Sequence, residues 1–386
     1  MTRDVIVIGA GLAGSSMAAV LAEQGWNVLL IERDHFPRHK VCGEFLSPES
    51  QKSLRALGLY ADIAALDPSP VTQAQIIAQS GLTIQLPLPG QAWGVSRYAL
   101  DVALSQAAQQ RGATLWTGMT VKSYAQEGDH WLVQVRDGEQ TVTVRTRALI
   151  AACGRHSQFG LPPKARPLAR SQQAVGVKCH YAQITMPPQV ELFMFPGGYA
   201  GINPVEGGRV NVCLLVSYPA FAQAGKRVDA LLAAAAQGNR AFAQRLAAGH
   251  MLPETAVAVA PVDTGRPAQP WADMACLGDT AVMIPPLCGD GMAMALRSTE
   301  LCAPLAAAFL KGSLSLAGWE AAYTKLWHSE FDQRLRWGRL LQKGLHRPRL
   351  ADLLIKLGRV APPLATYLVQ ATRGRAAGSK AVSSNQ

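Results

Sequence analysis

Three glycines near the N-terminus have the spacing of a loop that binds nucleotide phosphates. Gly9, Gly11 and Gly14 form the pattern G-x-G-x-x-G directly after a short apolar run, and Ser15 begins a predicted helix. Glycine permits a tight turn here and lets a diphosphate approach the N-terminus of the helix, whose backbone N–H groups favour an anion. Glu32 follows a second apolar run, where its carboxylate can accept a ribose hydroxyl. The spacing predicts a dinucleotide site and leaves both FAD and NAD open.

Further motifs follow in a fixed order along the chain. Arg97 begins a predicted helix, and Cys153 follows a predicted buried strand. The Gly-Asp pair 278–279 follows another apolar run, and the segment 285–292 leads into an apolar helix. Together with the glycine motif, they resemble the flavoprotein superfamily of geranylgeranyl reductases, aromatic-ring hydroxylases (group A flavin monooxygenases) and flavin-dependent halogenases, over roughly residues 1–310.

The resemblance implies FAD rather than NAD as the cofactor. In the family the Gly-Asp pair holds the ribityl chain, and a helix N-terminus faces the flavin edge that is anionic when reduced. Arg97 matches an arginine near the diphosphate, its alternative being a solvated helix residue, and Cys153 stands where the family usually has aspartate. The predicted cofactor-binding residues are Gly9, Gly11, Gly14, Glu32, Arg33, Cys42, Gly43, Arg97, Gly278, Asp279, Pro286, Gly289, Gly291 and Met292.

Two further segments resemble the geranylgeranyl reductases in particular. The triplet Cys42-Gly43-Glu44 matches a motif that lies beside the flavin in those enzymes. Tyr199 matches a second motif, although Gly201 stands where the reductases have tryptophan. Cys42 and Tyr199 are therefore the candidate catalytic residues. The alternative for Cys42 is a small residue buried under the flavin.

The resemblance implies an FAD-dependent oxidoreductase that acts on a hydrophobic organic substrate (isoprenoid, lipid or polyketide-like). It is most like a reductase or dehydrogenase of the geranylgeranyl reductase type, with hydride transfer at flavin N5. The alternative is an NAD(P)H-dependent flavin monooxygenase that hydroxylates an alkylated aromatic, and a third hypothesis is a non-catalytic, membrane-attached flavin-binding protein. Halogenation is set aside because residues 71–96 contain no lysine to hold a hypohalous acid. The chain has no second G-x-G-x-x-G, so we expect transiently bound NAD(P)H, a ferredoxin or a quinol as the reductant.

The elements that must position these residues predict an α/β fold. We expect a discontinuous Rossmann-like FAD-binding domain of the GR2 type, interleaved with an antiparallel β-sheet substrate domain and followed by C-terminal helices. An Ala-rich helix is predicted over 228–247. The predicted boundaries are 1–70, 97–160 and 265–312 for the FAD-binding domain, 71–96 and 161–264 for the substrate domain, 313–372 for amphipathic helices and 373–386 for a disordered tail.

The basic charge is concentrated near the C-terminus. Of the net charge of +11, most lies beyond residue 333, where eleven Lys/Arg face one acidic residue, Asp352. Leucines at 350, 353, 354 and 357 add an apolar stripe at helical spacing. We therefore expect 334–372 to contact an anionic membrane surface. The alternative is ordinary packing on the body, and nucleic-acid binding is not expected because no binding module accompanies the charge.

Cysteine usage and hydropathy give a further expectation on location. The seven cysteines form no C-x-x-C pair and no cluster with histidines, which argues against a metal site and a disulfide framework. No uninterrupted apolar stretch is long enough to span a bilayer. We expect a cytoplasmic protein, peripheral to the inner face of the membrane through its C-terminal helices.

Overall fold

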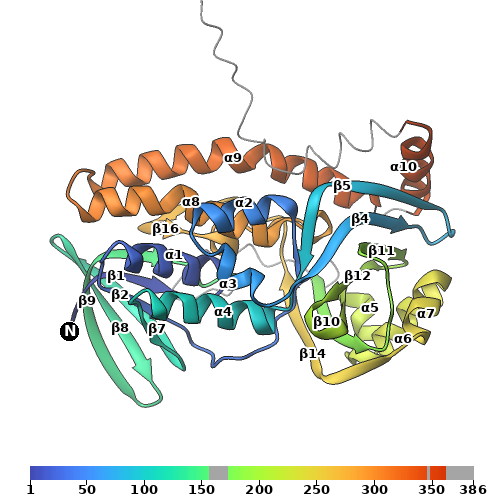
Figure 1. Ribbon diagram of the computed structural model, residues 1–386, viewed down its shortest axis with the longest axis horizontal. Helices are drawn as coiled ribbons and strands as arrows, with labels where there is room; N and C mark the ends of the chain where they lie inside the picture. The colour runs from blue at the N-terminus through green and yellow to red at the C-terminus, as the bar shows by residue number, and fades with distance from the viewer. Residues whose placement is uncertain (156–172, 346–347, 362–386) are drawn as a thin grey trace, which may run out of the picture.

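Two eight-stranded sheets occupy the two ends of the molecule (Figure 1). The computed structural model describes residues 1–155, 173–345 and 348–361, and it confirms the predicted α/β fold. The first sheet has the order β15-β16-β9-β1-β2-β6, with β8 pairing β9 and β7 pairing β8. Its strands are β1 (Thr2–Ile8), β2 (Val28–Ile31), β6 (Thr114–Trp116), β7 (Met119–Glu127), β8 (His130–Asp137), β9 (Gln140–Ala151), β15 (Trp271–Ala272) and β16 (Met274–Cys276).

Strand β1 lies inside the first sheet because its residues are apolar on both faces. Val5, Ile6 and Val7 are fully buried, and β1 pairs in parallel with β2 and β9. Helix α1 (Leu12–Glu23) packs beside it, and α4 (Arg97–Gln110) and α8 (Gly291–Leu310) pack against α1. Among the described residues, α8 alone is long and apolar enough to cross a bilayer. It packs against α1, α2 (Pro48–Ala56) and α9 (Leu316–Leu345), as a core helix does.

The second sheet has the order β14-β10-β13-β12-β11-β4-β5-β3. We predicted an antiparallel sheet, but β4 and β11 pair in parallel, so the sheet is mixed. The short α3 (Tyr60–Ala64) precedes β4. The strands are β3 (Phe45–Leu46), β4 (Ser69–Ile77), β5 (Thr83–Gly94), β10 (Ala174–Ala182), β11 (Gln189–Phe195), β12 (Gly198–Val205), β13 (Arg209–Ser217) and β14 (His250–Val262).

The helical layer on the second sheet contains a break that we did not predict. Instead of one helix over 228–247, the chain forms α6 (Val228–Gly238) and α7 (Arg240–Ala247), after the short α5 (Tyr218–Gln223). Asn239 between them is extended, with φ −148° and ψ 109°. Its side chain accepts a hydrogen bond from the Phe242 N–H and donates to the carbonyl oxygen of Met194 at 2.9 Å. Asn239 therefore ends one helix, caps the next and ties both to the sheet.

The C-terminal helices run across both sheets. Helix α9 extends along the top of the molecule, and α10 (Pro348–Val360) lies beside the β4–β5 hairpin (Figure 1). Trp319, Tyr323, Trp327 and Phe331 recur every four residues along α9 and are at most 1% exposed. Burial of this aromatic stripe makes α9 part of the core.

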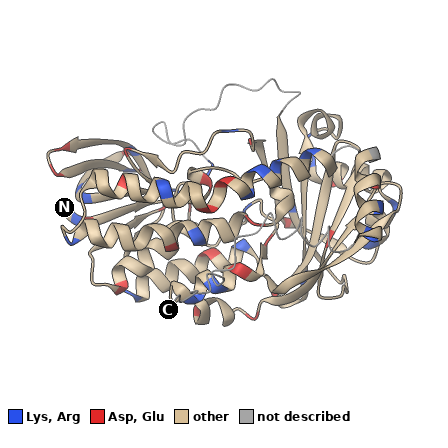
Figure 2. Ribbon diagram, turned by 90° about the horizontal axis from the view of Figure 1, so that it is seen from above, with Lys and Arg blue, Asp and Glu red and all other residues tan. Residues whose placement is uncertain are grey.

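The basic C-terminal segment is only partly open to solvent. Arg334 is buried in ion pairs, and Arg339 donates to the carbonyl oxygens of Thr264 and Arg266. Acidic and basic residues are interspersed along the covering helices (Figure 2). The predicted tail at 373–386 and the last part of the predicted 313–372 helices lie outside the described residues.

Candidate functional site

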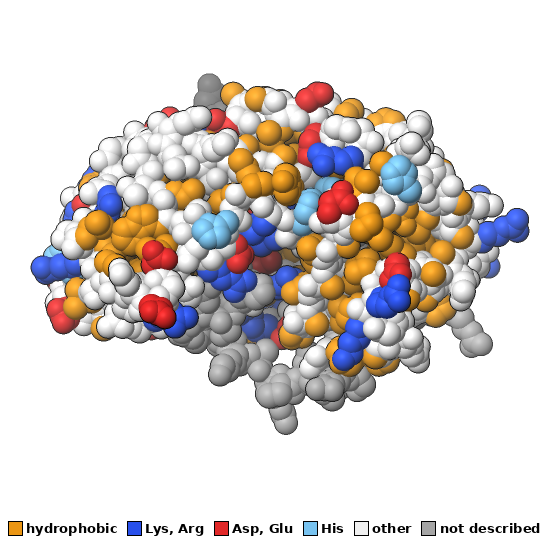
Figure 3. All heavy atoms as spheres, turned by 90° about the horizontal axis from the view of Figure 1, so that it is seen from below, with side chains coloured by type: hydrophobic (Ala, Val, Ile, Leu, Met, Phe, Trp, Pro, Cys, Tyr) orange, Lys and Arg blue, Asp and Glu red, His pale blue; other side chains and the backbone are white. Residues whose placement is uncertain are grey.

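A cavity of about 420 Å³ lies where the two sheets meet. From below, the molecule is hollowed near its middle, and basic and histidine side chains gather around the hollow (Figure 3). Gly9, Glu32 and Arg33 line a smaller adjacent cavity, and Gly14 is buried in α1. The predicted site residues that line the large cavity are Gly11, Cys42, Gly43, Arg97, Tyr199, Gly278, Asp279, Pro286, Gly289, Gly291 and Met292.

Glycine is required at each of the three positions of the N-terminal loop for a different structural reason. Gly9 has φ +99°, and a Cβ there would lie 2.4 Å from the carbonyl oxygen of Ala152. A Cβ on Gly14 would lie 1.8 Å from the carbonyl oxygen of Gly9, so this glycine lets α1 pack against the strand. A Cβ on Gly11 would approach protein atoms no closer than 3.6 Å. The bare backbone at Gly11 therefore leaves room for a ligand rather than for the protein itself.

Two cations converge over Gly11. From the position of a Gly11 Cβ, the Arg97 Nη2 atom lies 3.6 Å away and the Lys40 Nζ atom 3.7 Å away. Asp101 holds the Arg97 guanidinium through two hydrogen bonds of 2.8 Å. Burial and the neighbouring Arg97 lower the pKa of Lys40 to about 8. Two cations at a helix N-terminus fit a diphosphate, whose negative charge would stabilise both of them.

Glu32 fixes the other side of the glycine loop. Its carboxylate accepts a hydrogen bond of 2.9 Å from the Ala10 N–H and pairs with Arg38 at 2.9 Å. Arg38 also pairs with Asp101 at 3.0 Å, which connects both halves of the site. We did not predict Arg38, Lys40 or Asp101 as site residues. Two features of the sequence could have indicated these residues: the basic residues of this loop and the i, i+4 spacing of Arg97 and Asp101.

The wall across the cavity is built by Asp279 and the turn before α8. Burial raises the pKa of Asp279, which follows Gly278 at the end of the first sheet. Gly289, in the left-handed region with φ +68°, ends a short 3₁₀ turn, and Gly291 begins α8. This wall therefore offers a carboxylate that can accept hydrogen bonds from hydroxyls and a helix N-terminus that favours an anion.

The two candidate catalytic residues keep their protons at neutral pH. Burial raises the pKa of the Cys42 thiol, whose sulfur accepts a hydrogen bond from the Glu44 N–H at 3.4 Å. A protonated thiol is a poor nucleophile. Tyr199, on β12, is 5% exposed, and burial raises its pKa well above the usual value. Both side chains can act as neutral polar groups in the cavity wall.

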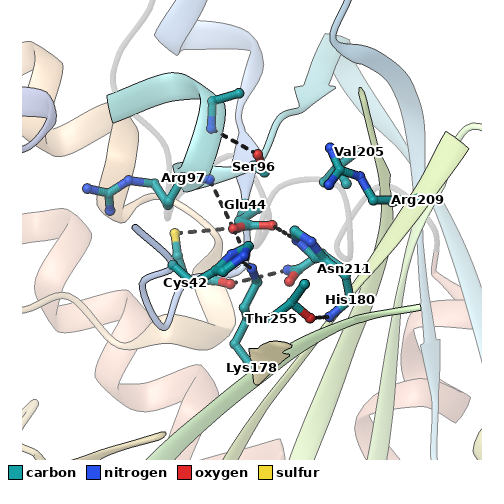
Figure 4. Close-up of polar contacts among 12 residues, drawn as sticks. Cys42, Glu44, Ser96, Arg97, Lys178, His180, Val205, Arg209, Asn211 and Thr255 are labelled. Carbon is teal, nitrogen blue, oxygen red and sulfur yellow. Dashed lines mark hydrogen bonds and ion pairs between the residues drawn. The ribbon is translucent and has the colours of Figure 1, made fainter. Parts of the chain in front are cut away.

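A buried polar cluster lies beside Cys42, and we did not predict it from the sequence. Glu44 lies next to Lys178 and His180 of β10, and Asn203 and Asn211 bond to the backbone of the same loop (Figure 4). Lys178 and His180 alternate with apolar residues on their strand, so only their spacing of two residues signalled a shared face.

The donor set fits FAD. Gly11, Lys40 and Arg97 can hold its diphosphate, Glu32 and Arg33 line the cavity that suits a ribose, and Asp279 can accept from its ribityl hydroxyls. This division of roles follows from the chemistry of each wall.

Comparison with known proteins agrees with this assignment. The FAD binding domain family matches residues 2–321. The chain is 27% identical over 360 residues to digeranylgeranylglycerophospholipid reductase 2 of Methanopyrus kandleri, covering 87% of this chain and 85% of the relative. It is 26% identical over 393 residues to menaquinone reductase of Mycolicibacterium smegmatis, covering 96% and 90%.

The fold is shared more widely than the sequence. The solved structure of the flavin-dependent brominase Bmp2 has a TM-score of 0.78 at 19% identity, covering 96% of this chain and 93% of that one. An identity this low shows the fold alone. The family match and the long reductase alignments place the chain more closely: it belongs to the FAD binding domain family and is an FAD-dependent oxidoreductase related to the geranylgeranyl-type reductases.

Proposed function

We propose that this enzyme reduces a carbon–carbon double bond in a long, apolar, isoprenoid-like substrate. The observation that carries the proposal is the part of the cavity wall formed by the second sheet, the end of α9 and α10, where most of the lining side chains are hydrocarbon. Such a wall can bury a long apolar chain but offers few partners to a polar one. The apolar lining residues are Ile76, Ile84, Leu86, Leu88, Val190, Leu192, Leu215, Leu345, Leu354 and Ile355.

Bound FAD supplies hydride chemistry at its N5 atom. The residues of this chain orient the substrate and exclude water. Tyr199 and Cys213 are among the few polar side chains on the substrate side, and burial keeps both protonated by raising the pKa of each group. Tyr199 can therefore donate a hydrogen bond from its hydroxyl to a polar head group. Gly201 also lines the cavity, and a Cβ there would lie 3.4 Å from Leu192 Cδ2.

The relatives support reduction rather than oxygen insertion. Two proteins that align with most of this chain are named reductases, one of a digeranylgeranylglycerophospholipid and one of menaquinone. These names describe lipid substrates that suit an apolar cavity. The reductant of this enzyme is proposed to be transiently bound NAD(P)H, a ferredoxin or a quinol.

We further propose that the substrate enters from a membrane surface at α10. Leu357 lines the cavity and is also 49% exposed, so the cavity wall reaches the protein surface there. Leu353 and Val360 extend the exposed apolar face, and Lys356 and Arg359 flank it. Exposed leucines beside basic residues fit an anionic bilayer. The protein would then act as a peripheral enzyme at the inner face of the membrane.

An anaerobic single-turnover experiment tests the reductase proposal. The FAD-loaded protein is reduced with dithionite and mixed with a geranylgeranyl lipid or with its fully saturated analogue. We expect flavin reoxidation only with the unsaturated lipid, and a product that has gained two hydrogen atoms by mass spectrometry. Reoxidation that requires oxygen, with one oxygen atom added to an alkylated aromatic, would instead establish a monooxygenase.

A further inference from the structure

Three charged or titratable side chains are fully buried next to the cofactor cavity. Glu44, Lys178 and His180 are each 0% exposed. The Lys178 Nζ atom lies 3.1 Å from Glu44 Oε1, and the His180 Nε2 atom lies 2.6 Å from Glu44 Oε2. The side chains converge on Glu44, which also lines the cavity (Figure 4). Burial of an ion pair costs desolvation free energy, so we looked for a function of this cluster.

The cluster continues to the protein surface through His39. The Lys178 Nζ atom lies 3.2 Å from His39 Nδ1, and the half-buried His39 ring stacks on Tyr98, which is 37% exposed. An ammonium group only donates hydrogen bonds, so His39 Nδ1 must accept. Burial and the neighbouring Lys178 and His180 lower the pKa of His39 to about 4, so the ring is neutral and can accept at neutral pH.

We propose that His39, Lys178 and Glu44 form a proton path from solvent to the wall of the cofactor cavity. The proposal rests on the proposed reduction, in which hydride addition to a double bond also consumes one proton. Lys178 Nζ gives a proton to Glu44 Oε1, and the carboxylic acid formed in this way gives that proton to an acceptor in the cavity. Once Lys178 is neutral, His39 exchanges with solvent to the tautomer that carries its proton on Nδ1. Nδ1 gives that proton to Lys178 Nζ as Nε2 takes one from solvent, which restores the starting tautomer. Each residue returns to its starting state with one proton moved inward.

The charges around the path suit this transfer. Glu44 is held ionised, because His180 and Lys178 outweigh its burial and lower its pKa. The carboxylate therefore holds no resting proton and readily gives up the one that it receives from Lys178. Arg209 is the other charged group that faces His39, and it disfavours a resting charge on the imidazole. His180 lies off the path, because its Nδ1 atom is buried with no hydrogen-bond partner among the described residues. The route from solvent to Glu44 therefore runs through His39 and Lys178.

The Lys178→Arg variant distinguishes proton transfer by Lys178 from a role in positioning Glu44. Arginine keeps the positive charge and the pairing with Glu44, but a guanidinium does not release its proton. The readout is proton uptake, followed with a pH indicator during anaerobic photoreduction of the FAD-loaded protein in weak buffer without substrate. We expect Lys178→Arg to retain FAD and to slow uptake by about 10²-fold, a typical contribution of a positioned acid–base group. Because no substrate is added, the reduced cofactor is the proton acceptor in the cavity, and a wrong substrate proposal leaves this test intact.

If Lys178→Arg does not fold, a variant of His39, at the solvent end of the path, tests the proposal instead. His39→Ala should slow uptake similarly, and added imidazole should restore it. His35→Ala, in the same loop but exposed and outside the cluster, is the matched control and should keep the wild-type rate without imidazole. Wild-type uptake in both His39→Ala and Lys178→Arg would overturn the path. Slow uptake in His39→Ala that imidazole does not rescue would also overturn it, since that result indicates a structural role.

Discussion

The guanidinium of Arg334 lies 3.6 Å from the carboxylate of Asp290, the residue directly before α8. Both residues are at most 3% exposed, and Arg334 also pairs with Glu49 at 3.2 Å. The contact connects the middle of α9 to the helix N-terminus that lines the cofactor cavity. Helix α9 is therefore a part of the cofactor site, and its basic residues are not all available to a membrane.

Removing Arg334 should be strongly destabilising. Arg334→Met leaves the Asp290 charge buried without this partner, and loss of one member of a buried pair costs about 3–5 kcal/mol. Urea denaturation of the purified proteins measures the free energy of unfolding. Lys343→Met, on an exposed position of the same helix, is the control and should change it by less than about 0.5 kcal/mol. Equal stabilities of the two variants would contradict a stabilising role for the pair.

Substitutions of two loop glycines should have different effects, one on FAD binding and the other on folding stability. Gly11→Ala adds a Cβ that the protein tolerates but that occupies the approach of the diphosphate. We expect an unchanged melting temperature of the apoprotein and at least roughly tenfold weaker FAD binding. Gly14→Ala places a Cβ 1.8 Å from the Gly9 carbonyl oxygen, so its melting temperature should fall instead. Tight FAD binding by Gly11→Ala would show that the diphosphate lies elsewhere.

FAD affinity should depend on pH through Lys40. In the free protein its pKa is lowered to about 8, by burial and then by Arg97. A bound diphosphate raises that pKa again, so binding takes up a proton above about pH 8 and the dissociation constant should increase between about pH 7 and pH 9.5. Calorimetry in buffers of different ionisation enthalpy measures the proton uptake directly. Lys40→Met should bind more weakly and lose this pH dependence; retention of the dependence would assign it to another group.

Asp279 should lower the stability of the apoprotein and strengthen FAD binding. Burial raises its folded-state pKa, so the native state holds its proton more tightly than the unfolded chain does. Stability then falls as pH rises through that range, and the ionised group destabilises the apoprotein at neutral pH. Asp279→Ala should therefore raise the apoprotein melting temperature at neutral pH and weaken FAD binding by about 1.5–3 kcal/mol. Thermal scans with and without FAD check both, and unchanged affinity would show that this carboxylate makes no bond to the cofactor.

Membrane contact should depend on the exposed leucines of α10. Replacing Leu353 and Leu357 by glutamine removes the apolar face, and we expect the variant to float less with anionic liposomes at low salt. Leu326→Gln is the matched control, because this leucine is 41% exposed but lies in the first half of α9 and not on α10. High salt should weaken wild-type binding without abolishing it. Failure of the intact protein to float with anionic liposomes would end the membrane proposal.

The sequence by itself determined the features that depend on local geometry. The spacing of Gly9, Gly11 and Gly14 specifies a loop whose shape depends on a few adjacent residues, and the order of the later motifs specified the family and FAD. The apolar runs also predicted the strands and helices of the α/β fold, because alternation and helical periodicity are local signals.

Tertiary structure decided which distant side chains meet. Lys178 and His180 lie 134 and 136 positions from Glu44, and Arg334 lies 44 positions from Asp290. Charged residues in a strand are expected to face solvent, and only the assembled sheet shows that these two are buried. The parallel pairing of β4 with β11 and the position of α10 over the cavity likewise depend on contacts between distant segments. Burial in a common interior gives these residues their partners and their altered pKa values, and a linear pattern does not encode which segments share that interior.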